Sequence, residues 1–283
     1  MNPPGTFRGD GAGPTSVVGF GRFGQAFCEL LVEAEIPVRA WDPYAEVPPE
    51  LRADDPQQLL DGASMVVLAV PVGEIRDTLG VLRPLLTADH CVMDVGSVKH
   101  GPIAAMAETL GREIPWVATH PLFGPSSIAL GDRPLRAVVC PNDLHSEAVA
   151  RARALYERLG CEVIEQTADE HDRAMARTHA IAFFVAKGLI DIGASEGLAF
   201  TPPSFTALSQ MIDTVRSDAG HLFLAIEREN PFAAAARREL LDALELVHAR
   251  LGDLEDPRNA ENSVGLTIPD LGEQAPSRDR PGI

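Results

Sequence analysis

The sequence predicts an α/β protein in which an N-terminal doubly wound sheet is followed by an all-helical C-terminal domain. Two observations support this prediction. Short, continuously apolar runs alternate with helical stretches up to residue 165, a pattern typical of a parallel sheet that is covered on both faces. Beyond residue 168 the strand pattern stops and long helical stretches follow.

The expected elements follow one another in a regular order. The predicted strands are residues 16–20, 37–41, 64–70, 91–95, 116–120, 137–140 and 161–165. The predicted helices are 23–34, 73–86, 101–110, 144–159, 169–195, 203–228 and 232–251. Prolines at Pro202, Pro203 and Pro231 separate the last three helices, because proline cannot continue a helix. We expect four segments, namely a disordered lead (1–14), a sheet domain (15–168), a helical domain (169–252) and a disordered tail (253–283).

Composition and charge narrow the class of partner. The 283 residues are 45% hydrophobic and 23% charged, which is ordinary for a soluble globular protein. A net charge of -17 repels phosphate backbones and anionic lipid, so we expect neither nucleic acid nor membrane as a partner. No apolar run approaches the roughly 20 residues that span a bilayer, and the N-terminus lacks the apolar core of a signal peptide. We therefore expect a cytoplasmic protein.

Neither cysteines nor histidines show the spacing of a metal site. Cys28, Cys91, Cys140 and Cys161 are widely scattered, and we interpret them as reduced core residues. His171 and His179 lie eight residues apart on one predicted helix, not at the spacing of a helical metal-binding pair. We expect no metal.

A glycine motif follows the first predicted strand. Its residues are Gly19, Phe20, Gly21, Arg22, Phe23 and Gly24. In a G-x-G-x-x-G at a strand-to-helix junction, the glycines allow a tight turn, close approach to a pyrophosphate and close helix packing, and the helix N-terminus favours the phosphates. This is the fingerprint of a Rossmann-type dinucleotide-binding domain.

An acidic residue then indicates which dinucleotide is bound. Asp42 closes the second strand, 18 residues after Gly24, where a carboxylate accepts from the ribose hydroxyls and repels a 2′-phosphate. We expect NAD rather than NADP, although Arg22 and Arg39 are near in sequence. Val70 and Pro71 end the third strand and are expected to pass the adenine and ribose side of the cofactor, although proline there can also simply end a strand.

Two further motifs lie at predicted strand ends, where open α/β sheets bind ligands. They are DVGSVK at 94–99 and THPLFGP at 119–125. Together with Glu170-His171-Asp172 at the start of the helical domain, they resemble the prephenate and arogenate dehydrogenase family over residues 16–251. The resemblance implies NAD-dependent oxidative decarboxylation of a cyclohexadienyl acid, prephenate or arogenate, to an aromatic product in tyrosine biosynthesis. It also implies a homodimer formed through the helical domain.

The resemblance assigns roles to several residues. His120 matches the family histidine that takes the proton of the ring hydroxyl, a task that suits a group with a pKa near neutrality. Ser97 matches the serine that hydrogen-bonds this histidine or the substrate hydroxyl, although Ser97 could also cap a helix. Lys99 could cap the next helix or neutralise a carboxylate. His171-Asp172 is interpreted as structural, and His179 is expected to face the substrate.

This sequence departs from the family pattern at the residue that would bind the ring carboxylate of the substrate. Some family members carry an arginine where this chain has Thr206. A substrate with two carboxylates still needs cations, for which arginine is well suited. The candidates are Arg133, Arg136, Arg173, Arg177 and Arg216, and Arg177 is favoured because it shares a helix with His179.

Three alternatives stay open. A related enzyme could act on 4-amino-4-deoxyprephenate in a specialised pathway. A β-hydroxyacid dehydrogenase or imine reductase would share the glycine motif and a helical domain, and Lys187 would be its candidate lysine. A non-catalytic NAD sensor would bind the cofactor without turnover.

Overall fold

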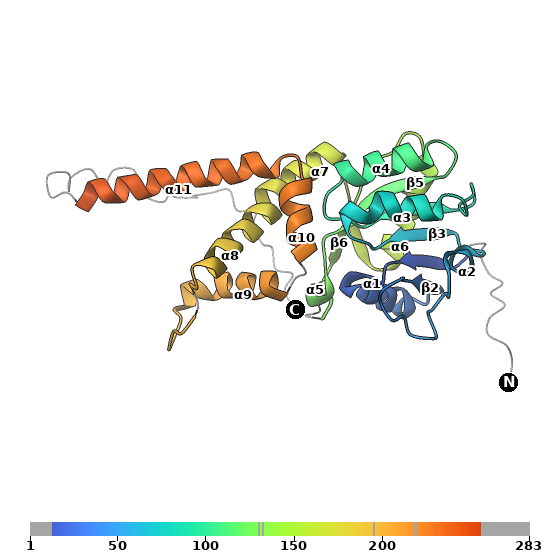
Figure 1. The fold of residues 1–283 in the computed structure, drawn as a ribbon, viewed down its shortest axis with the longest axis horizontal. Coiled ribbons are helices and arrows are strands. Elements are labelled where there is room, and N and C mark those ends of the chain that lie inside the picture. Colours follow the sequence, from blue (N-terminus) through green and yellow to red (C-terminus); the bar gives the residue numbers. More distant parts are fainter. Residues whose placement is uncertain (1–12, 130, 132, 195, 218–219, 256–283) are drawn as a thin grey trace, which may run out of the picture. The chain divides into compact units, whose positions relative to one another are not determined.

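The computed structural model describes residues 13–129, 131, 133–194, 196–217 and 220–255 (Figure 1). Contacts divide the chain into two units, Met1–Ala236 and Arg237–Ile283. The first unit contains the sheet and all helices before α11 (Ala233–Glu255), and most of α11 belongs to the second. The boundary expected at residue 168 between a sheet domain and a helical domain stays a prediction.

A seven-stranded sheet confirms the predicted fold class. Its strand order is β2-β1-β3-β4-β5-β6-β7. The strands are β1 (Thr15–Val18), β2 (Val38–Trp41), β3 (Met65–Leu68), β4 (Cys91–Asp94), β5 (Trp116–Pro121), β6 (Leu135–Val139) and β7 (Cys161–Glu165). Each overlaps one of the predicted apolar runs.

One strand pair corrects the expectation of a parallel sheet. The first five strands pair in parallel, but β6 runs antiparallel to β5, with His120 opposite Val138. β7 then pairs in parallel with β6. The β5–β6 connection contains α5 (Pro125–Ala129) as its helix. At about 1.5 Å per residue, five helical residues are too short to lead the chain back across the sheet, so the next strand reverses.

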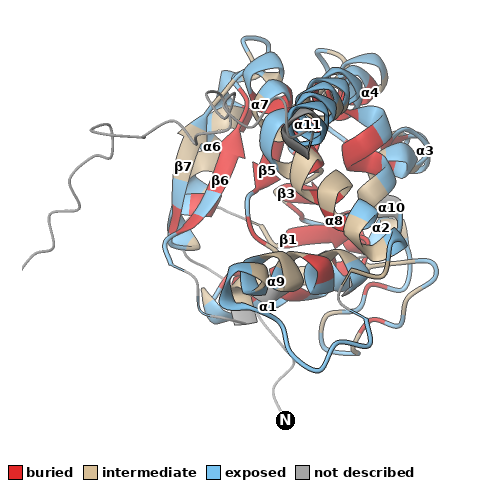
Figure 2. Ribbon diagram, turned by 90° about the vertical axis from the view of Figure 1, so that its left-hand side faces the viewer, coloured by how far each residue is buried: buried red, intermediate tan, exposed pale blue. Residues whose placement is uncertain are grey.

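Helices cover both faces of the sheet, as Figure 2 shows by the buried strands between them. Besides α5, the helices connecting the strands are α1 (Arg22–Glu33), α2 (Pro56–Leu60), the short 3₁₀ turn η1 (Val72–Glu74), α3 (Ile75–Leu82), α4 (His100–Leu110) and α6 (Ser146–Arg158). Successive strand residues serve opposite faces. Val17 packs in the core cluster with Phe27 and Tyr156, whereas Val18 packs in the cluster with Leu79.

The chain after β7 is helical, and two of the predicted helices contain a π-helical turn. Their elements are α7 (Ala168–Met175), η2 (Ala176–Ala180), α8 (Ile181–Asp191), α9 (Pro203–Ser217), α10 (Gly220–Leu224) and η3 (Ala225–Glu229). The π turns η2 and η3 pack against each other, and α8 packs against α9. Because π turns are frequent at functional sites, η2 and η3 are candidate parts of a functional site.

The ends of the chain differ slightly from the expected disordered segments. Ser64 donates hydrogen bonds to the carbonyls of Gly13 and Pro14, within the expected lead. Helix α11 continues to Glu255, within the expected tail. The rest of both segments lies outside the described residues. All four cysteines are buried and free, and burial raises the pKa of Cys28 to about 12.

Candidate active site

The glycine turn has the geometry that its motif predicts. Gly19 has a φ of 97°, and a Cβ there would lie 2.5 Å from the carbonyl oxygen of Ala69. A Cβ on Gly24 would lie 2.2 Å from the carbonyl oxygen of Gly19. Around Gly21 there is open space within 4 Å. The first and third glycines are therefore required by the fold, and the second leaves room for a ligand at the start of α1.

This difference predicts opposite results for two alanine substitutions. Gly24→Ala should lower the free energy of unfolding, because its Cβ would overlap backbone. Gly21→Ala should leave unfolding nearly unchanged and weaken NAD⁺ binding, because its methyl group would occupy the space left for the pyrophosphate. Denaturant unfolding and cofactor titration of both variants test this. Equal loss of stability in the two variants would contradict it.

Asp42 is held against the glycine turn by backbone donors. Its Oδ2 accepts from Phe20 N–H at 2.7 Å, and its Oδ1 accepts from Tyr44 N–H and Ala45 N–H. Partial burial raises the pKa of Asp42, but these three hydrogen bonds outweigh burial and leave the pKa below its usual value. Asp42 is therefore an anion at the end of β2, which fits ribose hydroxyls and disfavours a 2′-phosphate. Arg39 donates instead to the carbonyls of Gln58 and Asp61.

The other predicted cofactor residues surround the same turn. Arg22 is exposed as the first residue of α1. The Phe23 ring lies 5.7 Å from that of Phe27 and 6.3 Å from that of Phe123, so it joins α1 to the THPLFGP segment. Val70 and Pro71 are half-buried beyond β3, and Val70 lies beside Gly19.

A buried ion pair joins the carboxyl ends of β4 and β5. Lys99 and Asp94 are both fully buried, with 2.5 Å between Nζ and Oδ2. Lys99 Nζ also donates to the Thr119 carbonyl, and Asp94 accepts from Gly96 N–H and Thr119 N–H. Burial raises the pKa of Asp94, and the ammonium of Lys99 opposes that rise. Lys99 thus neutralises a carboxylate, and the pair positions the strand ends that carry Ser97 and His120.

His120 heads a buried chain of hydrogen bonds. Its Nδ1 lies 2.8 Å from His171 Nε2, and His171 Nδ1 lies 2.7 Å from Asp172 Oδ1. Burial lowers the pKa of His120 well below its ordinary value, and His171, Lys99 and His179 lower it further. His120 is therefore neutral near pH 7, the form that can accept a proton.

Asp172 also holds the helical part against the sheet. Its Oδ1 accepts from Lys99 N–H at 2.8 Å, and its Oδ2 accepts from His100 N–H at 3.1 Å and lies 2.8 Å from His100 Nδ1. Asn230 donates to its backbone carbonyl. The interpretation of His171-Asp172 as structural is therefore incomplete, because His171 also contacts His120. The only sequence signal is that the pair opens a helix, directly after a Thr167–Glu170 capping box.

Ser97 has a buried hydroxyl without a partner. Only 7% of the residue is exposed, and its Oγ makes no hydrogen bond to any described residue. It caps no helix, because the N-cap of α4 is Lys99. It does not bond His120 either. Since a buried hydroxyl without a partner is costly, Ser97 fits a site where a ligand supplies the missing hydrogen bond.

His179 lies in the same cluster, on the π turn η2. Its ring packs edge-on against Phe183 at 4.6 Å. His179 lowers the pKa of His120. The pKa of His179 itself is lowered to about 4, mainly by burial and to a smaller extent by the nearby His171. The structure therefore brings His120, His171 and His179 together. No group of metal ligands occurs among the residues that the structure describes.

The low pKa of His179 predicts how stability depends on pH. The unfolded chain binds a proton at His179 near pH 6.5, and the folded protein only near pH 4. Between these values the unfolded state holds more protons, so the free energy of unfolding falls as pH falls through this window. His179→Gln should flatten this dependence in urea titrations at several pH values. The exposed His248→Gln is the control; an identical slope in His179→Gln and the parent protein would refute the prediction.

The other predicted substrate residues are less closely tied to this cluster. Arg177 is exposed on η2, two residues before His179, and Thr206 is exposed near the start of α9. Arg136, Arg173 and Arg216 form ion pairs with Glu162, Asp169 and Glu196. Arg133 is exposed just before β6. Arg177 stays the favoured candidate because it lies on η2 together with His179.

Lys187 does not take the position that a catalytic lysine would need. It lies on α8, its side chain is 46% exposed, and it pairs with Asp191 one helical turn later. This surface pair gives no support to the β-hydroxyacid dehydrogenase or imine reductase alternative.

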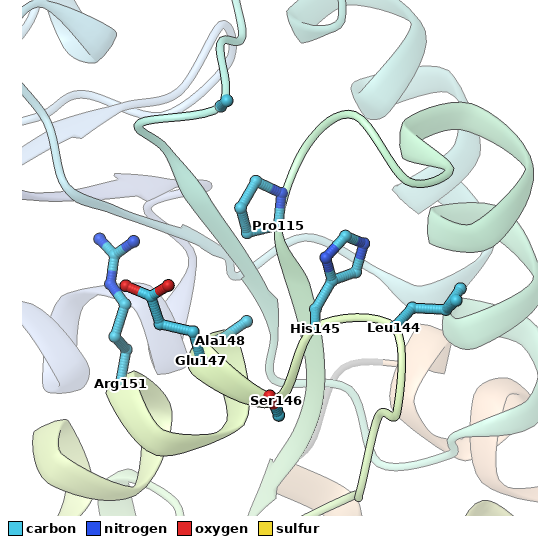
Figure 3. Close-up of a pocket in the computed structure, with 8 residues that line it drawn as sticks. Pro115, Leu144, His145, Ser146, Glu147, Ala148 and Arg151 are labelled. Atoms are coloured by element: carbon cyan, nitrogen blue, oxygen red, sulfur yellow. The ribbon is translucent and has the colours of Figure 1, made fainter.

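A pocket of about 280 Å³ opens at the opposite end of the strands from His120. Its lining includes Pro115, His145, Glu147 and Arg151, at the amino ends of the strands and the start of α6 (Figure 3). His145 already bonds the Gly111 carbonyl, and Arg151 bonds that of Ser64. Ligands of open α/β sheets bind at the carboxyl ends, so this pocket is separate from the candidate site.

Comparison with known proteins identifies relatives of the chain. Residues 49–165 match the family described as prephenate dehydrogenase, nucleotide-binding domain. The chain is 24% identical to arogenate dehydrogenase 2, chloroplastic, of Arabidopsis thaliana, covering 91% of this chain and 79% of that protein. It is 28% identical to 4-amino-4-deoxyprephenate dehydrogenase of Streptomyces pristinaespiralis, covering 88% and 87%.

Solved structures show the same fold. A prephenate dehydrogenase from A. aeolicus, in complex with hydroxyphenyl propionate and NAD⁺, superposes with a TM-score of 0.69 at 18% identity, covering 88% of this chain and 94% of that one. Synechocystis arogenate dehydrogenase gives a TM-score of 0.63 at 19% identity, covering 88% and 95%. No helix among the described residues is long and apolar enough to cross a membrane.

Proposed function

We propose that this chain oxidises and decarboxylates a cyclohexadienyl acid with NAD⁺, a proposal supported by the match of residues 49–165 to the nucleotide-binding domain of prephenate dehydrogenase. The observation that carries the proposal is the pairing of two groups at the carboxyl ends of adjacent strands. Neutral His120 lies at the carboxyl end of β5 as a base, and Ser97 follows β4 with a buried hydroxyl that lacks a partner. Both belong to the domain whose glycine turn fits a dinucleotide.

The cofactor site is assigned to the turn between β1 and α1. The open space at Gly21 and the anionic Asp42 fit NAD⁺, and Val70 and Pro71 border the same turn. NAD⁺ supplies the hydride acceptor. The exposed start of α1 offers N–H donors to its phosphates, while Asp42 selects a ribose without a phosphate.

His120 acts on the proton of the ring hydroxyl. As hydride leaves the carbon that bears this hydroxyl, the oxygen becomes a carbonyl and must lose its proton, which His120 Nε2 accepts. Ser97 Oγ hydrogen-bonds the same oxygen and orients it. Loss of CO₂ from the ring carboxylate then makes the product aromatic. Arg177, with His179 beside it, is assigned to a substrate carboxylate, and Thr206 to the cleft wall.

The amino-substituted substrate remains a second candidate for a specific reason. Thr206 stands where an arginine would hold the ring carboxylate, and the Streptomyces relative is named for 4-amino-4-deoxyprephenate. Prephenate, arogenate and 4-amino-4-deoxyprephenate share the cyclohexadiene ring and differ in their nitrogen substituents, so one panel separates them.

The test follows NADH formation with purified protein, NAD⁺ and each of the three substrates in turn. We expect turnover of one substrate and its loss in His120→Asn. Silence with all three, from folded protein that binds NAD⁺, would overturn the proposed function. Turnover of a β-hydroxyacid or an imine instead would establish the alternative class.

We also propose that the protein acts as a homodimer. Helix α11 exposes Leu244, Leu246, Val247 and Leu251, an apolar set that a second copy would cover. Light scattering on the full chain should give twice the mass of one chain, and a monomer at micromolar concentration would refute this part of the proposal.

A further inference from the structure

The hydrogen-bond chain from Asp172 to His120 has a direction. Hydrogen bonds from His171, His100 and the backbone of Lys99 outweigh burial and lower the pKa of Asp172, so Asp172 is a carboxylate. An ionised carboxylate only accepts hydrogen bonds. The contact of 2.7 Å between Asp172 Oδ1 and His171 Nδ1 therefore places a proton on His171 Nδ1.

The proton on His171 determines the tautomer of His120. A neutral imidazole carries one N–H and one lone pair, so neutral His171 presents a lone pair at Nε2. His120 Nδ1, 2.8 Å away, must then donate its proton to that lone pair. This leaves the lone pair of His120 on Nε2, which has no hydrogen-bond partner among the described residues.

We propose that Asp172 and His171 are positioning residues, which hold His120 in the tautomer whose Nε2 accepts the substrate proton and which stabilise the charge that this proton brings. The inference rests on the proposed function and extends it to two residues that do not touch the substrate. When Nε2 takes the proton, His120 becomes a cation whose Nδ1–H still points at His171. The carboxylate of Asp172 lies at the far end of that hydrogen bond chain.

The surroundings of His120 explain why such support is needed. Lys99, which is buried, and His179 both act on His120 electrostatically, and both lower its pKa. Asp94 is neutralised locally by Lys99. His100 contacts the other oxygen of Asp172, at 2.8 Å, and also lies 3.2 Å from Asp169. Among the residues that the structure describes, Asp172 is thus the acidic group connected to His120 through hydrogen bonds.

The reverse polarity would abolish the base. If His171 gains a proton, its Nε2–H donates to His120 Nδ1, and the proton of neutral His120 moves to Nε2. Protonation of the His120–His171 pair, in either ring, therefore removes the acceptor facing the substrate. Loss of this acceptor should therefore appear as the acid limb of the pH profile.

The first measurement needs no substitution and no substrate. Nitrogen NMR of the full-length protein labelled in its histidine rings distinguishes protonated from unprotonated ring nitrogens, and His120→Asn identifies the His120 signals among the eight histidines. We expect a protonated Nδ1 and an unprotonated Nε2 on His120. A proton on Nε2 would overturn the proposal.

Two substitutions then test the consequence for turnover. His171→Leu removes both hydrogen bonds and should lower kcat about 100-fold with KM nearly unchanged, and should shift the acid limb of the pH profile. His171→Gln offers an amide that can donate to Asp172 and accept from His120, and should recover roughly tenfold of that loss. The control His100→Gln touches the same carboxylate outside the chain, and should change kcat less than about threefold.

The outcomes distinguish the positioning role of Asp172 and His171 from the proposed function. If the parent protein is active and His171→Leu has the same kcat and pH profile, the positioning role of Asp172 and His171 is refuted. The proposed dehydrogenase function is not affected by that result. Equal losses in His171→Leu, His171→Gln and His100→Gln would also refute the positioning role, because they would indicate a structural role for the carboxylate. An inactive parent protein with the expected His120 tautomer would refute the proposed substrate class while leaving the positioning chain in place.

Discussion

Replacing His120 with asparagine is expected to lower kcat by about 10³-fold while leaving NAD⁺ affinity unchanged. His120 lies at the end of β5 and is neutral because burial and its neighbours lower its pKa. Asparagine retains hydrogen-bonding groups but cannot take up the proton that the ring hydroxyl must lose. Cofactor affinity should not change, because the glycine turn and Asp42, to which we assign the cofactor, follow β1 and β2 rather than β5.

The matched control is His90→Asn. His90 is also a buried histidine with defined hydrogen bonds, to the Leu60 carbonyl and to Thr87. It precedes β4, so it lies at the amino ends of the strands, whereas His120 lies at their carboxyl ends. Steady-state kinetics and cofactor titration of both variants should show the large loss of kcat in His120→Asn alone. A comparable loss in His90→Asn would indicate that any buried histidine substitution disturbs the fold.

Replacing Lys99 with methionine is expected to lower the free energy of unfolding by about 3–5 kcal/mol. The ammonium of Lys99 is fully buried against Asp94 and the Thr119 carbonyl. Methionine fills a similar volume but leaves the Asp94 carboxylate as an uncompensated buried charge. Turnover should fall as well, because this pair fixes the strand ends that carry Ser97 and His120.

Adding Asp94→Asn to Lys99→Met should recover part of the lost stability, since it removes the uncompensated charge. Lys187→Met is the control, because its pair with Asp191 is exposed and should contribute less than about 0.5 kcal/mol. Denaturant unfolding of the three variants measures all of these changes. A double variant less stable than Lys99→Met would show that the charge of Asp94 is stabilised by other groups.

The fold could be predicted from the sequence where burial leaves a simple pattern. Strands covered on both faces are continuously apolar, and runs such as 64–70 and 91–95 carry that signal. The reversal of β6 could not be predicted, because it depends on how far α5 reaches and not on any residue of β6. The π turns were not predicted, because η2 and η3 continue their helices and contain no glycine or proline that would mark a change.

The candidate site was predicted in part. Motif spacing indicated His120, Ser97 and the glycine turn, because each lies at or shortly after the carboxyl end of a strand. The role of His171 could not be read from the sequence, since 51 residues separate it from His120 and packing of α7 on α4 brings them together. For Lys99 the sequence predicted no more than a helix cap or a cation that neutralises a carboxylate. A lysine is rarely fully buried, and the sequence does not show which acidic residue it contacts.

Hydride transfer and loss of the ring carboxylate are proposed to occur in one site around His120. The most direct measurement follows NADH and CO₂ together during turnover of the cyclohexadienyl acid by the full-length protein. We expect one CO₂ for each NADH, with both lost in His120→Asn. NADH formed without CO₂, or either product formed at the parent rate in His120→Asn, would contradict it.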